Sequence, residues 1–306
     1  MTILESLRLR GQLLQNIRSY FVNEGLTEVT TPILNKFGSC EPTIKNLMLS
    51  EGKRCYLRTS PESCLKQLLA QDVGDIFEIG PAFRDEESTR LHLQEFTMIE
   101  WYRGNVELPE LIYDVQKLLR ACGYLEDIAT ISYGEIFFNA SGLDPHDCTS
   151  AELAVCAKDK GVVLEDDDLD DKGLLLDAVY VSTVEPFLRS HNPVFLIEYP
   201  VEHRAYARLS DSYNQTARRF ELVINGIEVA NGYDEVIDAT EQNFLFNSEN
   251  ATRERRGLEQ IKPDILWLNA LHSDISRMCG VALGLERLEM ILKNVNHIRK
   301  TGRFFN

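Results

Sequence analysis

Near the start of the chain, apolar residues recur every three to four positions. They are Leu13, Leu14, Ile17 and Phe21. This spacing predicts an amphipathic helix over residues 5–23, with Gly25 as its stop signal. Residues 27–31 are typical of a short strand, which Pro32 ends or places at a sheet edge. Similar patterns predict further helices over residues 110–122, 149–158, 173–189 and 285–292.

Farther along, two β-rich segments, residues 76–84 and 94–103, flank a polar stretch and predict an antiparallel hairpin. Because strand side chains alternate between faces, one face of the second segment is aromatic and acidic. That face carries Phe96, Met98, Glu100 and Tyr102. Arg84 at the tip could bind a phosphate, an aromatic ring could stack on adenine, and the carboxylates could accept from an ammonium group. The hairpin is a candidate aminoacyl-adenylate site; the alternative is a solvated hairpin with ordinary surface charges.

A second hairpin is predicted around Asn225-Gly226, a strong two-residue turn signal. In that register Val223 faces Glu228, and Glu221 lies on the face of Glu228 as its diagonal neighbour. Two carboxylates so placed repel each other unless a cation lies between them, and Mg²⁺ favours one or two carboxylates together with substrate phosphates. The pattern predicts a magnesium–nucleotide site; alternatively, both carboxylates point into solvent.

Three other segments carry candidate binding residues. Ser60-Pro61-Glu62 follows a predicted strand over residues 54–59, and Pro61 is expected at the first position of a helix. The segment from Asn231 to Glu235 supplies an amide and two carboxylates, of which Glu235 could accept from an ammonium group. After an apolar strand at 280–284, Arg287 opposes the dipole of the helix that follows. It is therefore held either for an anionic ligand or by a surface salt bridge.

Composition and charge narrow the class of protein. Hydrophobic residues make up 44% of the 306 residues and charged residues 26%, as in ordinary soluble globular proteins. The sequence has no signal peptide and no apolar run long enough to span a membrane. Its seven scattered cysteines form no Cys-x-x-Cys pair, which indicates reduced thiols in the cytoplasm and argues against a zinc site. The net charge of −16 argues against a large tRNA-binding face.

The order of predicted elements indicates an α+β fold around an antiparallel sheet. The sequence contains no Rossmann or P-loop signature. A run of six carboxylates at residues 165–171 is interpreted as a solvated loop before the helix at 173–189. Its spacing does not match an EF-hand calcium loop.

Taken together, these segments resemble the catalytic core of class II aminoacyl-tRNA synthetases, an antiparallel sheet flanked by helices. The first helix, strand and Pro32 look like motif 1 of that family, residues 83–100 like motif 2 and residues 280–287 like motif 3. The stretches TSPE at 59, EFTMIEWYR at 95, GIEVANGYDE at 226 and GVALGLERL at 280 are most similar to the lysyl branch. More narrowly, they resemble the EpmA family, also called PoxA or GenX, which comprises lysyl-tRNA synthetase paralogues that modify translation elongation factor P.

The resemblance also implies a domain organisation. Residues 1–306 would form a single catalytic domain, with a helical insertion at 104–200 between the motif 2 and motif 3 regions. The chain starts directly at motif 1, so no anticodon-binding domain is expected. Ala282 stands where lysyl-tRNA synthetases carry glycine and the paralogues carry alanine.

Residue roles follow from the same resemblance. Arg84 and Arg287 would be catalytic, gripping the phosphates of ATP. The ATP site would comprise Arg84, Asp85, Glu86, His92, Leu93, Phe96, Glu228, Val229, Gly284 and Arg287. The amino-acid site would comprise Ser60, Pro61, Glu62, Glu100, Tyr102, Asn231, Glu235 and Ala282. Glu221 and Glu228 would bind Mg²⁺.

The implied reaction is ATP-dependent activation of lysine or (R)-β-lysine as an aminoacyl-adenylate, followed by transfer to a lysine of elongation factor P. Motif 1 implies a homodimer. The alternatives are a shortened synthetase that activates another amino acid, for tRNA charging or ammonia-dependent amide synthesis, and a catalytically silent regulatory paralogue. The chain departs from the family pattern at three places. The loop segment Leu91-His92-Leu93-Gln94 lies on the adenine side of the expected site, whereas Arg204 and Asp234 leave the amino acid open.

Overall fold

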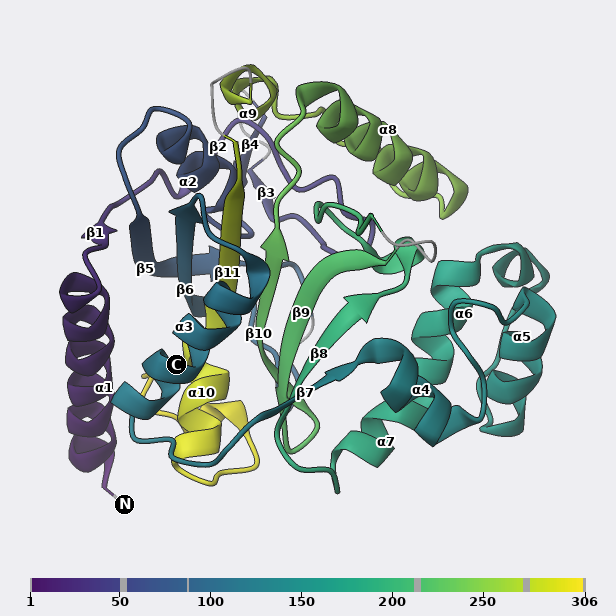
Figure 1. Cartoon of the computed structure of the whole chain (residues 1–306), viewed down its shortest axis with the longest axis horizontal. Coiled ribbons are helices and arrows are strands. Elements are labelled where there is room, and N and C mark those ends of the chain that lie inside the picture. The colour runs from purple at the N-terminus through teal and green to yellow at the C-terminus, as the bar shows by residue number, and fades with distance from the viewer. Residues whose placement is uncertain (1, 50–53, 87, 212–215, 272–275, 305–306) are drawn as a thin grey trace. The chain divides into compact units, whose positions relative to one another are not determined.

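The structure is a computed structural model that describes residues 2–49, 54–86, 88–211, 216–271 and 276–304, with only the backbone of residue 167. The chain divides into two compact units. Unit 1 comprises Met1–Leu125 and Asp234–Asn306, and unit 2 comprises Glu126–Tyr233. Figure 1 labels the helices and strands of both units.

Unit 1 is built from two sheets and six α-helices among its described residues. Its helices are α1 (Ile3–Asn23), α2 (Glu62–Leu69), α3 (Leu108–Ala121), α8 (Ala239–Arg255), α9 (Ile265–Ala270) and α10 (Leu285–Leu292). Its strands are β1 (Thr27–Glu28), β2 (Leu34–Asn35), β3 (Met48–Leu49), β4 (Cys55–Leu57), β5 (Ile76–Phe83), β6 (Glu95–Gly104) and β11 (Met278–Gly284). The main sheet has the order β1-β5-β6-β11, in which only the edge strand β1 pairs in parallel. A small antiparallel sheet has the order β2-β4-β3.

Unit 2 combines a second group of strands with helices. Its α-helices are α4 (Tyr133–Ser141), α5 (Ser150–Asp159), α6 (Lys172–Val179) and α7 (Glu185–Leu188). Its strands are β7 (Ala129–Ser132), β8 (Val194–Tyr199), β9 (Ala217–Ile224) and β10 (Ile227–Asp234). They have the order β10-β9-β8-β7, with β7 parallel to β8 and the other pairs antiparallel. The sheets and flanking helices confirm the predicted α+β class.

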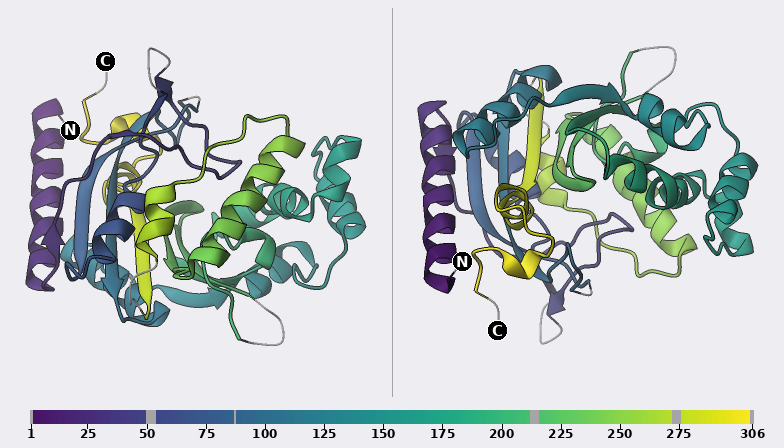
Figure 2. Two further views of the ribbon diagram at one scale, coloured as in Figure 1. Left: turned by 90° about the horizontal axis from the view of Figure 1, so that it is seen from above. Right: turned by 90° about the horizontal axis from the view of Figure 1, so that it is seen from below.

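Helices α1 and α2 cover opposite faces of the main sheet of unit 1. Phe21 of α1 stacks on Phe77, with ring centroids 4.5 Å apart, and lies 5.0 Å from Trp101. The side facing α2 is packed by Leu65, Leu69, Ile76, Tyr102 and Met278. Successive strand residues point to opposite faces, which separates these two clusters. Figure 2 shows the two helices on either side of the strands. Glu100, two residues before Tyr102, therefore faces the α2 side.

The core of unit 2 lies between its strands and helices α4 to α7. The rings of Tyr133 and Phe137 on α4 stack with centroids 5.6 Å apart, and Tyr133 lies 4.8 Å from Tyr199 at the end of β8. Leucine and valine residues make up much of the rest of this core. They are Leu153, Leu175, Leu176, Val179, Val184, Leu188, Val194, Leu196 and Val223.

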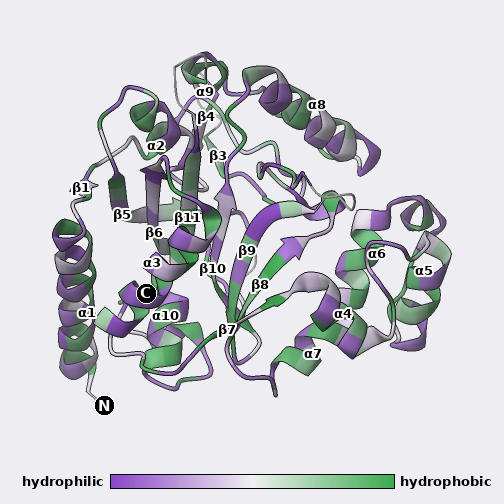
Figure 3. Cartoon of the chain, viewed as in Figure 1, coloured by the Kyte–Doolittle hydropathy of each residue, from purple (hydrophilic) through white to green (hydrophobic). Residues whose placement is uncertain are grey.

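Most strongly patterned segments form the predicted elements. Helix α1 starts at Ile3, where Thr2 and Glu5 form a reciprocal capping box, and it buries Leu13, Ile17 and Phe21. In Figure 3 hydrophilic and hydrophobic residues alternate along it. Helix α10 has the predicted bounds, and β5 and β6 form the predicted antiparallel hairpin. In the hairpin of β9 and β10, Ile224 pairs with Ile227 and Val223 with Glu228, as predicted.

Four expectations need correction. The strand predicted at 27–31 spans only two residues, because β1 pairs at the sheet edge with β5 alone. The acidic run contains a 3-10 helix, Asp166–Asp170, rather than an irregular loop. Pro61 is the N-cap of α2 rather than its first helical residue. The helix predicted at 173–189 contains a π-helical turn at Tyr180–Val184 between α6 and α7.

Helix α8 was not predicted because its buried face is mixed in character. Leu245 and Phe246 are buried beside Gln242, Asn250 and Arg253. The Asn250 amide donates to the Ile261 carbonyl and accepts from its N–H, so polar side chains occupy positions where periodicity requires apolar ones. Within the described residues, no helix is both long and apolar enough to cross a membrane.

Candidate active site

The hairpin of β5 and β6 holds Arg84 against Phe96. Arg84 follows the last residue of β5, and its backbone N–H donates to the Gln94 carbonyl at 2.9 Å. Its guanidinium lies 5.4 Å from the centroid of the Phe96 ring, a cation–π contact. The Arg84 Nε atom is buried and has no hydrogen-bond partner among the described residues. Arg84 therefore keeps a donor for an anion, as a phosphate-binding arginine requires.

Arg287, in the first turn of α10, reaches the loop of the same hairpin. Its Nη2 atom lies 3.0 Å from His92 Nε2, and its Nε donates to the Leu91 carbonyl at 3.5 Å. His92 Nδ1 is 2.9 Å from the hydroxyl of Thr89. The structure thus brings together Arg287 and His92, two predicted ATP-site residues nearly two hundred positions apart in the sequence.

The other predicted ATP-site residues of unit 1, together with Ala282, lie at the tip of this hairpin and on β11. Asp85 accepts from the Gln94 side chain at 3.4 Å, Glu86 is half-buried, and Leu93 is buried. Gly284 is the N-cap of α10. Ala282 pairs with Glu100 across β11 and β6.

A glycine on β11 makes room for Tyr102. Gly280 is the strand partner of Tyr102, and a Cβ atom on Gly280 would lie 2.1 Å from the Tyr102 ring. A side chain at this position would therefore displace the ring. Gly280 thus helps to place the Tyr102 hydroxyl, which donates to Glu100.

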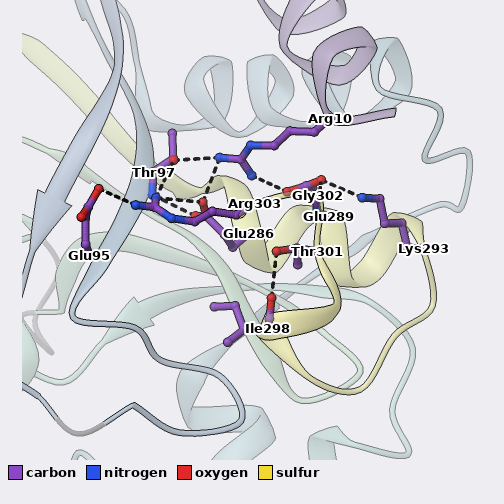
Figure 4. A network of polar contacts seen from close by, with 10 residues as sticks. All are labelled: Arg10, Glu95, Thr97, Glu286, Glu289, Lys293, Ile298, Thr301, Gly302 and Arg303. Carbon is purple, nitrogen blue, oxygen red and sulfur yellow. Dashed lines mark hydrogen bonds and ion pairs between the residues drawn. The ribbon is translucent and has the colours of Figure 1, made fainter. Parts of the chain in front are cut away.

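A network of charged groups fixes the start of α10 to β6 and α1 (Figure 4). The Arg10 guanidinium of α1 donates to Glu289, to Glu286 at 2.9 Å and to the Thr97 hydroxyl at 2.8 Å. Glu286 also accepts from the Thr97 N–H at 2.9 Å, and Arg303 lies 3.5 Å from it. Because Glu286 precedes Arg287 and Thr97 follows Phe96, the network holds together the two segments that carry these predicted ATP-site residues.

Loss of Arg10 should destabilise the fold. The side chains of Glu286 and Glu289 are 2% and 0% exposed, so Arg10→Met removes the main cation from two buried carboxylates. We expect a loss of about 3 kcal/mol in the free energy of unfolding, measured by urea denaturation. Arg18→Met on the same helix breaks the exposed pair with Glu28 and should change it by less than about 1 kcal/mol. Equal effects of the two substitutions would contradict the structural role of the network.

Three carboxylates predicted to bind an ammonium group gather around α2 and β6. Glu100 accepts from the Ser60 hydroxyl at 2.6 Å and from the Tyr102 hydroxyl at 2.9 Å. Glu62 at the start of α2 and Glu235 each lie 2.6 Å from the ammonium of Lys66. We call Glu62, Glu100 and Glu235 the acidic cluster. Glu100 and Glu235 are buried and Glu62 is partly exposed, so the cluster has one accessible end.

Burial and mutual repulsion set the protonation of this cluster. Burial raises the pKa of Glu100 to about 7, with a further contribution from Glu62. Burial also raises the pKa of Glu235, which the Lys66 ammonium opposes. For Lys66 itself, burial lowers the pKa, but Glu235 and Glu62 outweigh it and the pKa is raised above its usual value. Lys66 is therefore a resident cation among the three carboxylates.

Sequence reasoning missed Lys66. The signal was present, because Lys66 lies four residues after Glu62 in a predicted helix, the spacing at which a glutamate and a lysine pair. Its partner Glu235 is 169 positions away and gave no such signal. The indole of Trp267, whose ring centroid is 4.3 Å from Lys66 Nζ, was missed for the same reason.

In unit 2, the predicted magnesium ligands have a neighbour that the sequence did not reveal. Glu221 accepts from Arg219, whose guanidinium stacks 4.5 Å from the Tyr199 centroid and also donates to Asn231 at 3.2 Å. A bulge after Glu228 places Asn231, rather than a residue one position earlier, opposite Glu221. Burial raises the pKa of Glu221 and Arg219 opposes it. Glu228 is exposed and Val229 is buried.

Two departures from the family pattern have local partners. Arg204 donates to the Ala207 carbonyl at 2.9 and 3.1 Å. Asp234 is fully buried and its Oδ2 lies 3.6 Å from Arg277 Nε. Each added charge therefore has an interaction within its own unit. Over the described ranges, no group of three or more His, Cys, Asp and Glu side chains is placed to hold a metal ion.

Comparison with known proteins agrees with the three motifs. Residues 2–305 match the family model of class II tRNA synthetases (D, K and N). The chain is 35% identical over 308 residues to the elongation factor P--(R)-beta-lysine ligase of Pasteurella multocida, covering 98% of this chain and 95% of that protein. It is 34% identical to the protein of the same name from Histophilus somni, with the same coverage. It is 35% identical to that of Avibacterium paragallinarum, covering 96% of this chain and 94% of the relative.

The match to the family model spans almost the whole chain, and the relatives are matched over nearly their full length. The matched range, residues 2–305, includes the two motif arginines and the acidic cluster described above. The chain therefore belongs to the class II aminoacyl-tRNA synthetase family, in the group of the elongation factor P--(R)-beta-lysine ligases, and is accordingly an ATP-dependent amino acid ligase.

Proposed function

We propose that the protein activates lysine or (R)-β-lysine with ATP and transfers the aminoacyl group to a lysine side chain of translation elongation factor P. The observation that carries this proposal is the acidic cluster, whose carboxylates and neighbouring tyrosine suit a substrate with two amino groups. The names of the curated relatives support the same substrate and acceptor.

In the first step, a carboxylate oxygen of the amino acid attacks the α-phosphorus of ATP. A new O–P bond forms, the bond from the α-phosphorus to the bridging oxygen breaks, and pyrophosphate leaves. No covalent enzyme intermediate is needed, so the protein contributes positioning and charge stabilisation. Arg84 has a free buried donor and Arg287 is held by His92 and Leu91, and these two cations would stabilise the phosphate charge.

Magnesium would be held by Glu221 and Glu228, whose carboxylate oxygens are the ligand type that Mg²⁺ prefers. The contacts of unit 2 fit such a role, because Arg219 holds the Glu221 carboxylate in place while Glu228 stays exposed. When bound, the ion would neutralise part of the charge on the phosphates. Asn231, which accepts from Arg219 and donates to the Tyr233 hydroxyl at 3.0 Å, would orient the carboxylate end of the amino acid.

In the second step, the ε-amine of the acceptor lysine attacks the carbonyl carbon of the adenylate. An amide bond forms, the C–O bond to the phosphate breaks, AMP leaves, and the amine loses a proton. The acceptor is a translation factor, so we place the enzyme in the cytoplasm.

To test the transfer step, elongation factor P is incubated with enzyme, ATP, Mg²⁺ and (R)-β-lysine, and its intact mass is measured. We expect a mass increase of one aminoacyl group that disappears when the acceptor lysine is replaced by arginine. An unmodified factor, despite adenylate formation, would reject this acceptor.

A homodimer through α1 is part of the same proposal. Apolar side chains of α1 remain exposed in the single chain, namely Ile3, Leu4, Leu7, Leu9 and Val22. We expect sedimentation velocity to give twice the mass of the chain and Leu4→Lys with Leu7→Lys to give a monomer. Val155→Lys, at an exposed apolar position of α5, should leave the mass unchanged. A wild-type monomer at micromolar concentration would contradict the dimer.

A further inference from the structure

Lys66 is a buried cation that binds two carboxylates of the acidic cluster. Its side chain is 0% exposed, and its ammonium donates to Glu62 and to Glu235, both at 2.6 Å. The ammonium also lies 4.3 Å from the Trp267 ring centroid and 5.8 Å from that of Tyr102. Carboxylates and aromatic faces are the surroundings that a protein uses to bind an ammonium group. The cluster therefore already holds one ammonium group of its own.

The charges of the cluster can be counted. With Glu62, Glu100 and Glu235 ionised, the three negative charges and the one positive charge of Lys66 leave two negative charges. The two ammonium groups of a diamino acid bring two positive charges, while its carboxylate is the group that reacts with ATP. Glu62 is the partly exposed member, and its contact with Lys66 fixes the carboxylate at the accessible end. Lys66 thus affects both the charge and the geometry that an incoming diamino acid meets.

We propose that Lys66 is a positioning residue that determines specificity for a diamino acid: it orients Glu62 and Glu235 and leaves the cluster with the two negative charges that such a substrate requires. This inference rests on the proposed function. Lys66 itself need not touch the substrate, because it acts through the two carboxylates that it binds.

Loss of Lys66 should change the pH dependence of substrate binding. The groups that face Glu100 are Glu62 and Lys66 on α2, Tyr102 on β6 and Glu235. Among them Lys66 is the one cation, and it holds the pKa values of Glu100 and Glu235 below the levels that burial would otherwise set. Without it, the carboxylates ionise only at higher pH. Substrate binding would then require a higher pH.

The test compares wild type with Lys66→Met, Lys66→Gln and Lys66→Arg in ATP–pyrophosphate exchange from pH 6 to 9. Lysine and (R)-β-lysine are the substrates, with norleucine, which lacks the terminal amine, for comparison. We expect Lys66→Met and Lys66→Gln to raise the KM for the diamino acids at least about tenfold, equivalent to one pKa unit. The KM for ATP should stay within about twofold. The acid limb of kcat/KM should move to higher pH by about one unit, and the preference over norleucine should fall.

A matched control is Arg58→Met, which breaks another buried ion pair of unit 1, with Glu78 at 2.6 Å. It should reduce the active fraction but leave the acid limb and the amino-acid KM unchanged. An unchanged acid limb and an unchanged amino-acid KM in Lys66→Met and Lys66→Gln would overturn the proposal. Should Lys66→Met and Lys66→Gln fail to fold, Lys66→Arg decides. It retains the cation and must keep the acid limb while raising the amino-acid KM, and a wild-type KM would overturn the proposal. Wild-type enzyme that exchanges with no diamino acid would instead reject the proposed function.

Discussion

Arg84→Ala is expected to lower the kcat of ATP–pyrophosphate exchange by about 10² to 10³-fold. This is the usual effect of removing one donor to a developing negative charge. The reason lies in the Arg84 guanidinium, which stacks on Phe96 and keeps a buried donor without a partner among the described residues. Arg287→Ala should have a comparable effect, because its contacts with His92 and Leu91 hold it at the same hairpin loop.

Control variants separate the catalytic role of Arg84 from its charge alone and from stability. Arg18→Ala, which removes an exposed guanidinium of α1, should leave kcat unchanged. Arg84→Lys should retain part of the kcat that Arg84→Ala loses, since lysine supplies the charge but not the planar fork of donors. Unfolding curves of Arg84→Ala, Arg287→Ala, Arg18→Ala and Arg84→Lys should overlay that of wild type. A wild-type kcat in Arg84→Ala would show that Arg84 does not act in the catalytic step.

The second large effect concerns pH. Because burial and then Glu62 raise the pKa of Glu100 to about 7, the carboxylate that we propose accepts an ammonium group of the substrate is lost below neutral pH. We expect kcat/KM for the amino acid to fall about tenfold per pH unit below pH 7 and to level off above it. Glu100→Gln should abolish this acid limb and give a low, flat profile. The KM for ATP should not follow the same titration.

The stability of the fold should change with pH in the direction opposite to kcat/KM. A carboxyl group whose pKa is raised by folding contributes stability that is fully present below its ordinary pKa of 4.5 and is lost as the pH rises through about 7. Ionisation of Glu100 therefore lowers the free energy of unfolding. Glu249 on α8 provides the control, because burial and Glu41 raise its pKa to about 7 as well. Glu249→Gln should leave the acid limb in place. If the acid limb disappeared in Glu249→Gln, it would reflect the titration of Glu249 and not that of Glu100.

Segments whose local pattern matches their tertiary surroundings could be predicted. The Asn225-Gly226 turn fixes the first pairs of β9 and β10, and the alternation along β6 separates the Phe21 side from the α2 side. Motif 3 could be placed because an apolar strand leads directly into a helix. For the same reason, the shared face of Glu100 and Tyr102 and the position of Arg84 at the hairpin tip could be anticipated from one hairpin.

Features that depend on contacts between distant residues could not be predicted. Glu235 meets Lys66, and Arg10 meets Glu286, across more than 160 positions. Arg219 was hidden for another reason, since it lies on the same strand as Glu221 two positions earlier and looked like an ordinary surface charge. The bulge after Glu228 changed the predicted diagonal pairing. The single-domain organisation over residues 1–306, with an insertion at 104–200, stays a prediction.

The amino acid is the point at which the alternatives differ. Arg204 binds the Ala207 carbonyl and Asp234 lies beside Arg277, so neither departure leaves a charge without a partner. An enzyme for amide synthesis would need a site for an acidic substrate, whereas unit 1 presents three carboxylates and one resident lysine. A silent paralogue would be expected to lose its motif arginines or its acids, and all of them are present.

The central claim is that this chain adenylates a diamino acid, and ATP–pyrophosphate exchange by the purified protein tests it most directly. The panel contains L-lysine, (R)-β-lysine, ornithine, aspartate and a sample without amino acid, each with Mg²⁺. We predict exchange that is stimulated by a lysine isomer and is lost in Arg84→Ala and Glu228→Ala. Stimulation by aspartate alone, or binding of ATP without exchange for any amino acid, would contradict it.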